Sequence, residues 1–532
     1  MWFDILEALI VAAVCLLSSV KCMQVFQSRR YQMKSYTKWL SENRNRNLRS
    51  YGVITLVTIA VAWYLPILLA LLISVEKARN SMAGWLVLAG FCAVTGIRLY
   101  GELTELRDTF VLTSRAKRLV SAHAVTYVIL AVLLLLLRLP VYLMYAAVPY
   151  ISWIPDRIMK PIEDSINKRF YDEARQKLSR RKDLICVGIT GSQGKTATKF
   201  ILKELLSRKY DVLTTPGSHN TQMGVSKTIN DLLENHHQVF LAEMGAQYKG
   251  DIRALTNLVR PKYGVITSIA PQHVDTLGSM EKVMRAKEEL IRGLPEKGMA
   301  FFGSDSMFVD RLYERCTREK YRATLDSNKK AYMYAGNISY TRRGMTFTLS
   351  CIDGGRIACR TKLLGRFHVQ DIATAACVAR KMGLTMAEIG EGIVRLMPRE
   401  HCLELKESQK CTLIDDTACR TLDGAADALN VLMSMSGKRI LVTGGLDQPD
   451  SRTEDGDYEY GSMMRDCVDL LVLVGDREDL NTIARAATEK RDGERGLSRK
   501  SVVYVTDREA ARDYLNEMVT LDDIVLIEGY LE

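Results

Sequence analysis

The sequence predicts an α/β protein with two parallel sheets that follow a helical transmembrane region. Apolar blocks dominate the first 150 residues, and from residue 184 onward short apolar runs alternate with amphipathic helical patterns. One Gly-rich turn joins an apolar run to such a helical pattern. The expected domains are a transmembrane helical region at 1–150, a basic juxtamembrane linker at 151–183, a central domain at 184–400 and a Rossmann-like domain at 401–532.

Four apolar blocks in the first region approach the length that crosses a bilayer, namely 3–20, 51–74, 83–97 and 122–150. The first block could instead be a cleaved signal peptide. Asp4 and Glu7 stand where such a peptide is positively charged, and no small-x-small cleavage site precedes Lys21. An uncleaved span is therefore favoured. The last block is interrupted at Arg138-Leu139-Pro140, which predicts a tight or re-entrant hairpin rather than one long helix.

Basic residues predict the orientation in the membrane. The chain of 532 residues has 73 Lys and Arg against 62 Asp and Glu, a net charge of +11. Eight of the basic residues lie in 21–50, where Glu42 is the one acid. The positive-inside rule then places 21–50, 98–120 and the chain after 157 in the cytoplasm of a multi-pass protein of the cell membrane. Basic runs between spans set topology or contact anionic lipid, so the expected partner is membrane lipid and not nucleic acid.

The cysteines and histidines indicate no metal centre by their spacing. The 12 cysteines include no Cys-x-x-Cys pair, and the seven histidines form no metal-ligand pattern. Neither a disulfide framework nor a zinc site is expected. The sequence leaves the oligomeric state open.

The segment VGITGSQGKT at 187–196 predicts a phosphate-binding loop. Backbone N–H groups freed by glycine point at phosphate oxygens, a lysine reaches the β- and γ-phosphates, and the following hydroxyl binds Mg²⁺ at a helix N-terminus. The strict P-loop spacing is not met, because Ile189 occupies the place of its first glycine. The predicted nucleotide contacts of the central domain are Gly191, Ser192, Gln193, Gly194, Lys195 and Thr196.

Three further polar residues follow strands or lie on the next helix of this domain. Glu243 closes the run QVFLAEM, His273 follows YGVITSI, and Lys287 lies in the helical pattern after it. Each has an ordinary interpretation, respectively a loop cap, a loop histidine and a surface i, i+4 ion pair. Beside a phosphate loop, however, they indicate a metal site, because γ-phosphoryl transfer needs Mg²⁺ held by oxygen ligands.

Five motifs in order extend this interpretation: TGSQGKTATK, TPGSHNTQMGVSKTI, LAEMGAQYKGDI, PKYGVITSIAPQHVDTLGSMEKVMRAKEEL and LLGRFHVQDIATAA. Their order resembles the Mur ligases, and among them the branch that adds D-alanyl-D-alanine to the peptidoglycan precursor. The resemblance covers about 184–532 and is strongest through residue 290. It implies a Mur-ligase-type P-loop ATPase domain and a C-terminal Rossmann-like ligase domain.

The resemblance implies ATP-dependent ligation of a carboxylate to an amine through an acyl phosphate. Lys195 would hold the β- and γ-phosphates, Thr196 and Glu243 one Mg²⁺, and His273 a second Mg²⁺. Lys287 matches the family's carbamylated lysine, which requires an amine that is neutral part of the time and hence partly desolvated. Asn220 falls in the substrate-side loop, and Asp416 in a motif that contacts the nucleotide. Lys195, Lys287 and His273 are thus the expected catalytic residues.

The chain departs from the family at several positions. Gly303, His368 and Asp371 stand where the family has asparagine, and Cys402 where it has arginine. The family's Asp-Asp-Ser-Tyr-Asn-Ala-Asn-Pro becomes DDTACRTL at 415–422, which keeps both acids and loses both asparagines. The final Lys-Gly-Ser begins with Glu528 instead. Base selectivity and the incoming amine are therefore not given by the resemblance.

Three functions are compatible with these observations. The leading one is a membrane-anchored ligase of a cell-envelope peptide or amino acid. A lipid-linked substrate is an option, because spans stand in the place of the family's domain that recognises the UDP-sugar. A poly-γ-glutamate-type synthetase and a degenerate, nucleotide-binding scaffold of an envelope complex are the alternatives. Thr443-Gly444-Gly445 is expected to be a plain strand-helix turn, since no G-x-G-x-x-G is present.

Overall fold

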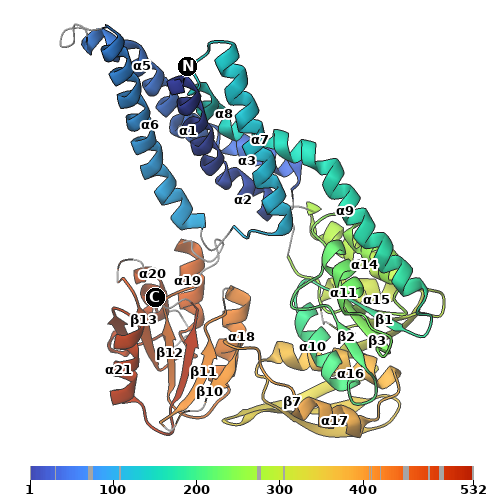
Figure 1. Ribbon diagram of the computed structural model, residues 1–532. Coiled ribbons are helices and arrows are strands. Elements are labelled where there is room, and N and C mark those ends of the chain that lie inside the picture. The colour runs from blue at the N-terminus through green and yellow to red at the C-terminus, as the bar shows by residue number, and fades with distance from the viewer. Residues whose placement is uncertain are drawn as a thin grey trace. The chain divides into compact units, whose positions relative to one another are not determined.

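The computed structural model divides the chain into two compact units, residues 1–169 and 170–532, each of which is described by itself (Figure 1). The described residues are 2–29, 31–69, 76–106, 110–271, 277–303, 306–406, 408, 410–419, 421–446, 454–476, 478, 480–490 and 496–529. The side chains at 48, 49, 67–69, 76–81, 103, 105 and 106 also lie outside the described part.

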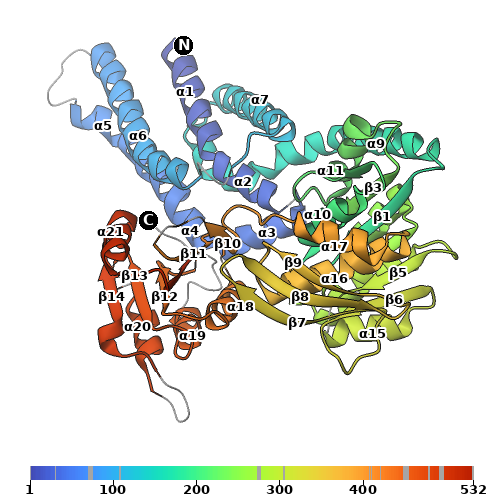
Figure 2. The same cartoon turned by 90° about the horizontal axis from the view of Figure 1, so that it is seen from below.

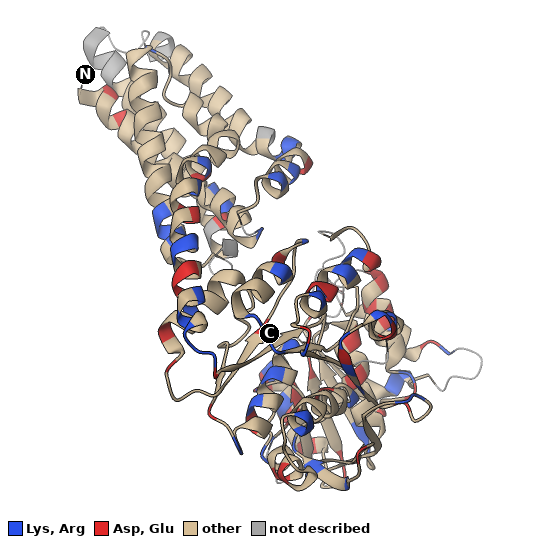
Figure 3. Cartoon of the chain, turned by 90° about the vertical axis from the view of Figure 1, so that its right-hand side faces the viewer, with Lys and Arg blue, Asp and Glu red and all other residues tan. Residues whose placement is uncertain are grey.

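The first unit is helical. Its elements are α1 (Trp2–Ser18), α2 (Val20–Ser28), α3 (Met33–Glu42), α4 (Arg44–Asn47), a π-helical turn η1 (Leu48–Val53), α5 (Ile54–Leu69), α6 (Glu76–Leu106), α7 (Ser114–Leu136), α8 (Leu143–Ile151) and the first part of α9 (Trp153–Ser179). Lys and Arg are few in the long apolar stretches of this unit and lie mainly toward one end of it (Figure 3). Helix α9 accounts for most of the predicted linker 151–183.

Four stretches of the described part are long and apolar enough to cross a membrane: Trp2–Ser28, Arg44–Pro66, Met82–Glu102 and Ser114–Leu136. The expected block 122–150 is divided as its sequence predicts. Helix α7 ends at Leu136, Arg138 takes a left-handed φ of 55°, and the short helix α8 follows Pro140. One candidate span and one short helix therefore replace a single long helix.

A partly buried arginine is paired inside the helical unit. The Arg98 guanidinium lies 3.7 Å from the centre of the Tyr51 ring and donates to the Tyr145 hydroxyl at 2.5 Å and to Glu102 at 2.7 Å. An unpaired charge within an apolar bundle is costly, so such residues pair with other polar groups. Arg98 is neutralised within its own helix by Glu102.

The second unit contains a nine-stranded sheet with the order β2-β3-β1-β4-β5-β6-β7-β8-β9. Strands β2 to β6 are parallel to β1, β7 runs parallel to β6, and β7-β8-β9 form an antiparallel meander whose last turn carries Gly354-Gly355. The strands are β1 (Ile185–Thr190), β2 (Val212–Thr214), β3 (Val239–Glu243), β4 (Tyr263–Ile266), β5 (Met299–Phe302), β6 (Glu319–Thr324), β7 (Met333–Thr341), β8 (Gly344–Cys351) and β9 (Arg356–Thr361).

Helices cover both faces of this sheet because its central strands are apolar on both sides. On β3, Val239 and Leu241 belong to one core cluster, and Phe240 and Ala242 belong to the other. The first face packs against α10 (Lys195–Leu206), α16 (Arg366–Lys381) and α17 (Met386–Val394), of which α16 and α17 lie along β7 to β9 (Figure 2). The second face packs against α11 (Gln222–Leu232), α12 (Asp251–Val259), α14 (Met280–Arg292) and α15 (Met307–Arg315).

The last domain is the predicted second sheet, with the order β10-β11-β15-β12-β13-β14. Only β10 is antiparallel to its neighbour. Its strands are β10 (Glu404–Lys406), β11 (Thr412–Asp416), β12 (Arg439–Thr443), β13 (Leu470–Val474), β14 (Val502–Val505) and β15 (Ile524–Glu528). The helices are α18 (Leu422–Met433), α19 (Glu454–Met463), α20 (Asn481–Thr488) and α21 (Arg508–Met518), with a short 3₁₀ turn η2 (Arg499–Ser501). The α/β class with two sheets is therefore confirmed.

Candidate phosphate and metal site

The Gly-rich loop joins β1 to α10, as the sequence predicts. Gly194 caps α10 with a left-handed φ of 77°, and a Cβ atom there would lie 2.4 Å from Oδ1 of Asp371. A Cβ atom on Gly191 would lie 1.9 Å from the Thr267 hydroxyl. Both positions therefore require glycine, because a side chain would displace the loop from the strand ends.

The loop is fastened to the segment that follows β4. The Ser192 hydroxyl accepts from the Ala270 N–H at 2.9 Å, and the Ser268 hydroxyl accepts from the Gln193 N–H at 2.8 Å. The Thr267 hydroxyl donates to the Gln193 carbonyl. These contacts preorganise the loop at the carboxyl edge of the sheet, where ligands of doubly wound sheets bind.

The Lys195 side chain folds back onto its own loop. Its ammonium donates to the carbonyl oxygens of Gly191 at 2.8 Å and Ser192 at 2.7 Å. Burial lowers the pKa of Lys195, and the nearby Glu243 partly counteracts this. A lysine held in this way is a positive charge beside the freed N–H groups of the loop, which is the arrangement that binds phosphate.

Glu243, at the end of β3, is the centre of the polar cluster. Its Oε2 accepts from the Thr196 hydroxyl at 2.9 Å and from the Lys199 ammonium at 2.9 Å, and its Oε1 accepts from the Asn220 amide at 3.1 Å. Neighbouring ligands of an octahedral Mg²⁺ with bonds near 2.1 Å lie about 3.0 Å apart. The spacing of the Thr196 and Glu243 oxygens therefore fits two ligands of one Mg²⁺.

Lys287, on α14, is not the surface residue that its neighbouring glutamates suggest. Its side chain is 4% exposed, and within the described residues it has no ion pair, while Glu288 pairs with Arg292 and Glu289 with Arg253. Burial, and secondarily the charge of Lys195, lowers the pKa of Lys287 to about 7. Its amine is therefore neutral in a substantial fraction of molecules at neutral pH.

Asp371, on α16, places a second carboxyl against the loop. Its Oδ1 accepts from the Thr198 hydroxyl at 3.0 Å, and its Oδ2 has no hydrogen-bond partner among the described groups. Burial raises the pKa of Asp371 to about 8, so the group is largely uncharged at neutral pH. A neutral carboxyl beside Gly194 does not repel phosphate.

The structure thus brings Lys195, Thr196, Asn220 and Glu243 together at the ends of β1 and β3. His273 lies outside the described residues. Asp416 lies in the second sheet, at the end of β11. Sequence reasoning missed Lys199, whose side chain is completely buried. Helical spacing could have identified Lys199, because it lies one turn after Thr196 and so shares the face of α10 that meets Glu243.

The fold and the loop together define a phosphate-binding α/β domain that is followed by a second α/β domain. Residues 189–379 match the Mur ligase middle domain, and residues 402–531 match the Mur ligase, glutamate ligase domain. Through these two domains, which together make up more than half of its length, the chain belongs to the Mur ligase family.

Relatives with this architecture include UDP-N-acetylmuramoyl-tripeptide--D-alanyl-D-alanine ligases. The chain is 31% identical to that of Haemophilus influenzae over 265 residues, which are 49% of this chain and 57% of the relative. It is 29% identical to that of Bacillus subtilis over 49% of this chain and 56% of the relative. The chain therefore matches little more than half the length of these curated relatives.

Solved structures share the fold. The MurF ligase of Thermotoga maritima in complex with ADP superposes with a TM-score of 0.57 at 22% identity, over 68% of this chain and 80% of that chain. A MurF structure from Acinetobacter baumannii gives a TM-score of 0.58 at 20% identity, over 69% and 78%. The covered share of this chain is close in size to the second unit.

Proposed function

We propose that this protein is an ATP-dependent carboxylate-amine ligase that forms an amide bond through an acyl phosphate in the synthesis of a cell-envelope, peptidoglycan-type precursor. The observation that carries the proposal is the joint position of Lys195, Thr196 and Glu243 at the carboxyl ends of β1 and β3. This apparatus lies in a chain that has both Mur ligase domains.

The residues of the loop take separate roles in this reaction. The N–H groups of 191–194 and the Lys195 ammonium bind and orient the β- and γ-phosphates of ATP, so that a substrate carboxylate meets the γ-phosphorus in line. Thr196 and Glu243 would hold Mg²⁺, which neutralises charge on the phosphates when bound. The Asn220 amide fixes the orientation of the Glu243 carboxylate on the substrate side.

Lys287 is proposed as a carbamylated lysine, with His273 as a further metal ligand. A neutral amine attacks CO₂ and loses a proton, which leaves a carboxylate on the side chain. The low pKa of Lys287 and its lack of an ion-pair partner within the described residues support this role. A carbon-13 NMR signal of a carbamate in ¹³C-bicarbonate, present in the wild type and absent from Lys287→Arg, is the expected result. The same spectrum in both proteins would refute carbamylation.

The donor is proposed to be a membrane-bound or membrane-delivered peptide. Spans precede the ligase domains, and 157–182 carries nine basic residues, each of which contributes about 1 kcal/mol of attraction near an anionic surface. The ligase domains would then face the cytoplasm of a multi-pass membrane protein. Purified protein in detergent with ATP and an amine should ligate a lipid-linked peptide. Rapid ligation of a soluble UDP-linked peptide alone would end this part of the proposal.

A nucleotide-binding scaffold is the alternative that specific residues favour. Asp371 and Glu528 replace an asparagine and a lysine of the family motifs, so the nucleotide and acceptor contacts are altered. ADP release on addition of envelope precursors, lost in Lys195→Ala, supports the ligase. Tight ATP binding without turnover on any carboxylate would support the scaffold. Turnover with glutamate and poly-γ-glutamate would indicate a poly-γ-glutamate-type synthetase.

A further inference from the structure

A second polar cluster lies in the last domain, on a different sheet from the phosphate loop. Strands β11 and β15 pair in parallel, with Asp416 directly opposite Glu528, and Glu528 is in turn opposite Thr443 on β12. Side chains in register on neighbouring parallel strands leave the same face of a sheet. Three polar side chains therefore meet at the carboxyl edge of this sheet, which is where doubly wound sheets bind ligands.

Cys419 completes the cluster from the turn that follows β11. One ligand atom each from Asp416, Cys419 and Glu528 lies within 4.8 Å of the other two. Asp416 is 6% exposed and Glu528 is completely buried. Cys419 and Glu528 are also two of the positions at which the sequence departs from the family motifs, so the departures coincide in space.

The two carboxyl groups have no cation beside them in the described part of the chain. Asp416 Oδ1 accepts from the Leu403 N–H at 2.8 Å, and Glu528 Oε2 accepts from the buried Tyr460 hydroxyl at 2.8 Å. Among the described groups, none forms a hydrogen bond with Oε1 of Glu528, which is buried. Burying two carboxylates side by side is strongly unfavourable unless a proton or a cation compensates them.

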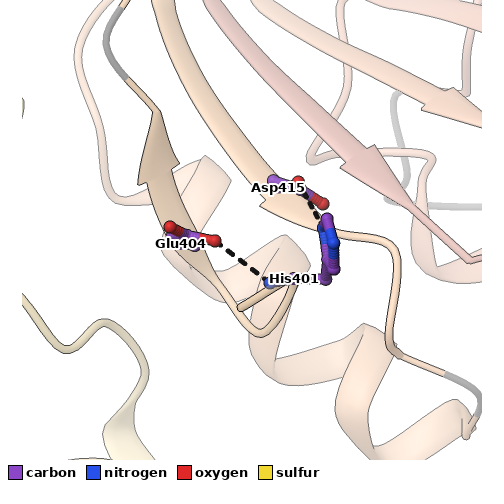
Figure 4. Close-up of side chains that lie close together, drawn as sticks. All are labelled: His401, Glu404 and Asp415. Carbon is purple, nitrogen blue, oxygen red and sulfur yellow. Dashed lines mark hydrogen bonds and ion pairs between the residues drawn. The ribbon is translucent and has the colours of Figure 1, made fainter. Parts of the chain in front are cut away.

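In a neighbouring cluster of the same domain, a lysine compensates the charge of two carboxylates. On the other side of β11, His401 Nδ1 lies 2.8 Å from Asp415 and the His401 N–H donates to Glu404 (Figure 4). Lys406 supplies the positive charge there, at 2.7 Å from Glu404 and 4.0 Å from Asp415. The charges and hydrogen bonds of that cluster are satisfied by its own side chains, so it does not require a metal ion.

We propose that Asp416, Cys419 and Glu528 form a binding site for one divalent transition-metal ion of the Zn²⁺ class. A thiolate with two carboxylates suits Zn²⁺, whereas Mg²⁺ and Ca²⁺ require shells of oxygen ligands. Tetrahedral zinc with bonds of about 2.0–2.3 Å separates its ligand atoms by about 3.3–3.8 Å. Because the ligand atoms lie within 4.8 Å of one another, the cluster needs to contract by at most about 1.5 Å. Three protein ligands leave a fourth position open.

Tyr460 acts as the positioning residue of this site. Its hydroxyl donates to Glu528 Oε2 and lies 3.2 Å from the Thr443 hydroxyl, which fixes the orientation of the Glu528 carboxyl group. The nucleotide contact expected of Asp416 stays a prediction that the metal site neither needs nor excludes.

The test uses the full chain, purified in detergent, stripped with a chelator and titrated with Co²⁺ and then Zn²⁺. One Co²⁺ per chain should give a sulfur-to-cobalt charge-transfer band in the near ultraviolet, and one equivalent of Zn²⁺ should remove it. Cys419→Ser should lose the band. Glu528→Gln should bind the metal at least 10- to 100-fold more weakly, because even the loss of an outer-shell partner of a metal ligand has an effect of about that size. Cys411→Ser and His401→Ala are the matched controls and should bind as the wild type does.

A second variant keeps the result decisive if Glu528→Gln does not fold. Glu528→Lys places an ammonium beside Asp416, as Lys406 does in the neighbouring cluster, and should be folded and metal-free. A chelator should lower the thermal unfolding midpoint of the metal-loaded wild type and leave that of Glu528→Lys unchanged. The site is refuted if the wild type takes up no stoichiometric metal or if Cys419→Ser and Glu528→Lys retain it. None of these readouts depends on ligase activity.

Discussion

The Lys199 ammonium lies 2.9 Å from Oε2 of Glu243, and the two side chains are 0% and 1% exposed. The same oxygen accepts from Thr196, so one carboxylate joins the phosphate loop, α10 and the end of β3. A buried ion pair of this kind is retained for function more than for stability, because desolvation offsets much of the attraction. The pair holds a ready-made anionic ligand beside the loop.

Lys199→Met should destabilise the protein by about 3–5 kcal/mol, because it leaves the buried Glu243 carboxylate without its counter-charge. Millimolar Mg²⁺ should restore part of the loss if Thr196 and Glu243 bind the ion. Thermal unfolding in detergent, with and without Mg²⁺, measures both effects. The double variant Lys199→Met/Glu243→Gln, which removes both charges, should be more stable than Lys199→Met. Equal stability of the two would show that the pair is not coupled.

Lys195→Ala should lower ATP turnover by a factor on the order of 10² or more, because a charge-assisted contact to the transferring phosphoryl group is lost. The protein should still insert and fold. Lys203→Ala, an exposed lysine on the same helix, is the control and should keep wild-type turnover. Equal rates for Lys195→Ala and the wild type would remove the ATPase assignment.

Lys287 should make stability depend on pH in a defined direction. Its pKa is about 7 in the folded protein, below its ordinary value of 10.5. Between these values the unfolded chain binds a proton that the folded chain does not, so stability rises with pH from about 7 to about 10. In CO₂-free buffer, the thermal midpoint of Lys287→Met should exceed that of the wild type most at pH 7 and below. A difference between the two proteins that is constant across this range would contradict the depressed pKa.

Gly194→Ala should lose nucleotide binding and about 1–2 kcal/mol of stability, because alanine is strained in the left-handed region and its Cβ would press on Asp371. Gly354→Ala is a matched control. Gly354 also has a positive φ, 97°, but nothing lies within 4 Å of its added Cβ. The control should share the backbone cost and keep nucleotide binding, as measured by fluorescence titration with a labelled ATP analogue. Loss of binding in both variants would mean that contact with Asp371 is irrelevant.

The charge distribution predicts that positions 44 and 117 face the cytoplasm and position 77 the exterior. Arg44 and Lys117 are exposed in the helical unit, and the side chain of Lys77 lies outside the described part. Single cysteines at the three positions, in a background without reactive native cysteines, can be labelled with an impermeant reagent on intact cells. Only the cysteine at 77 should react. Labelling at 44 from outside would reverse the topology.

Much of the fold follows from local patterns. Alternating apolar runs and helical segments predicted both sheets, and Arg138-Leu139-Pro140 predicted the break between α7 and α8. The Gly-rich loop predicted the turn from β1 to α10, because only glycine adopts a φ of 77° there without strain. These features are set by a few neighbouring residues, so the sequence alone determines them.

Tertiary structure decided the partners of the charged residues. The sequence left a surface ion pair open for Lys287 beside a desolvated role, and the packing of α14 on the sheet decides for burial, with Glu288 paired to Arg292 instead. The spacing of cysteines indicated no metal site, yet the parallel pairing of β11 with β15 brings Asp416, Cys419 and Glu528 within 4.8 Å. Strand order and register bring together residues distant in the chain, and burial then changes their pKa values, so no local pattern contains this information.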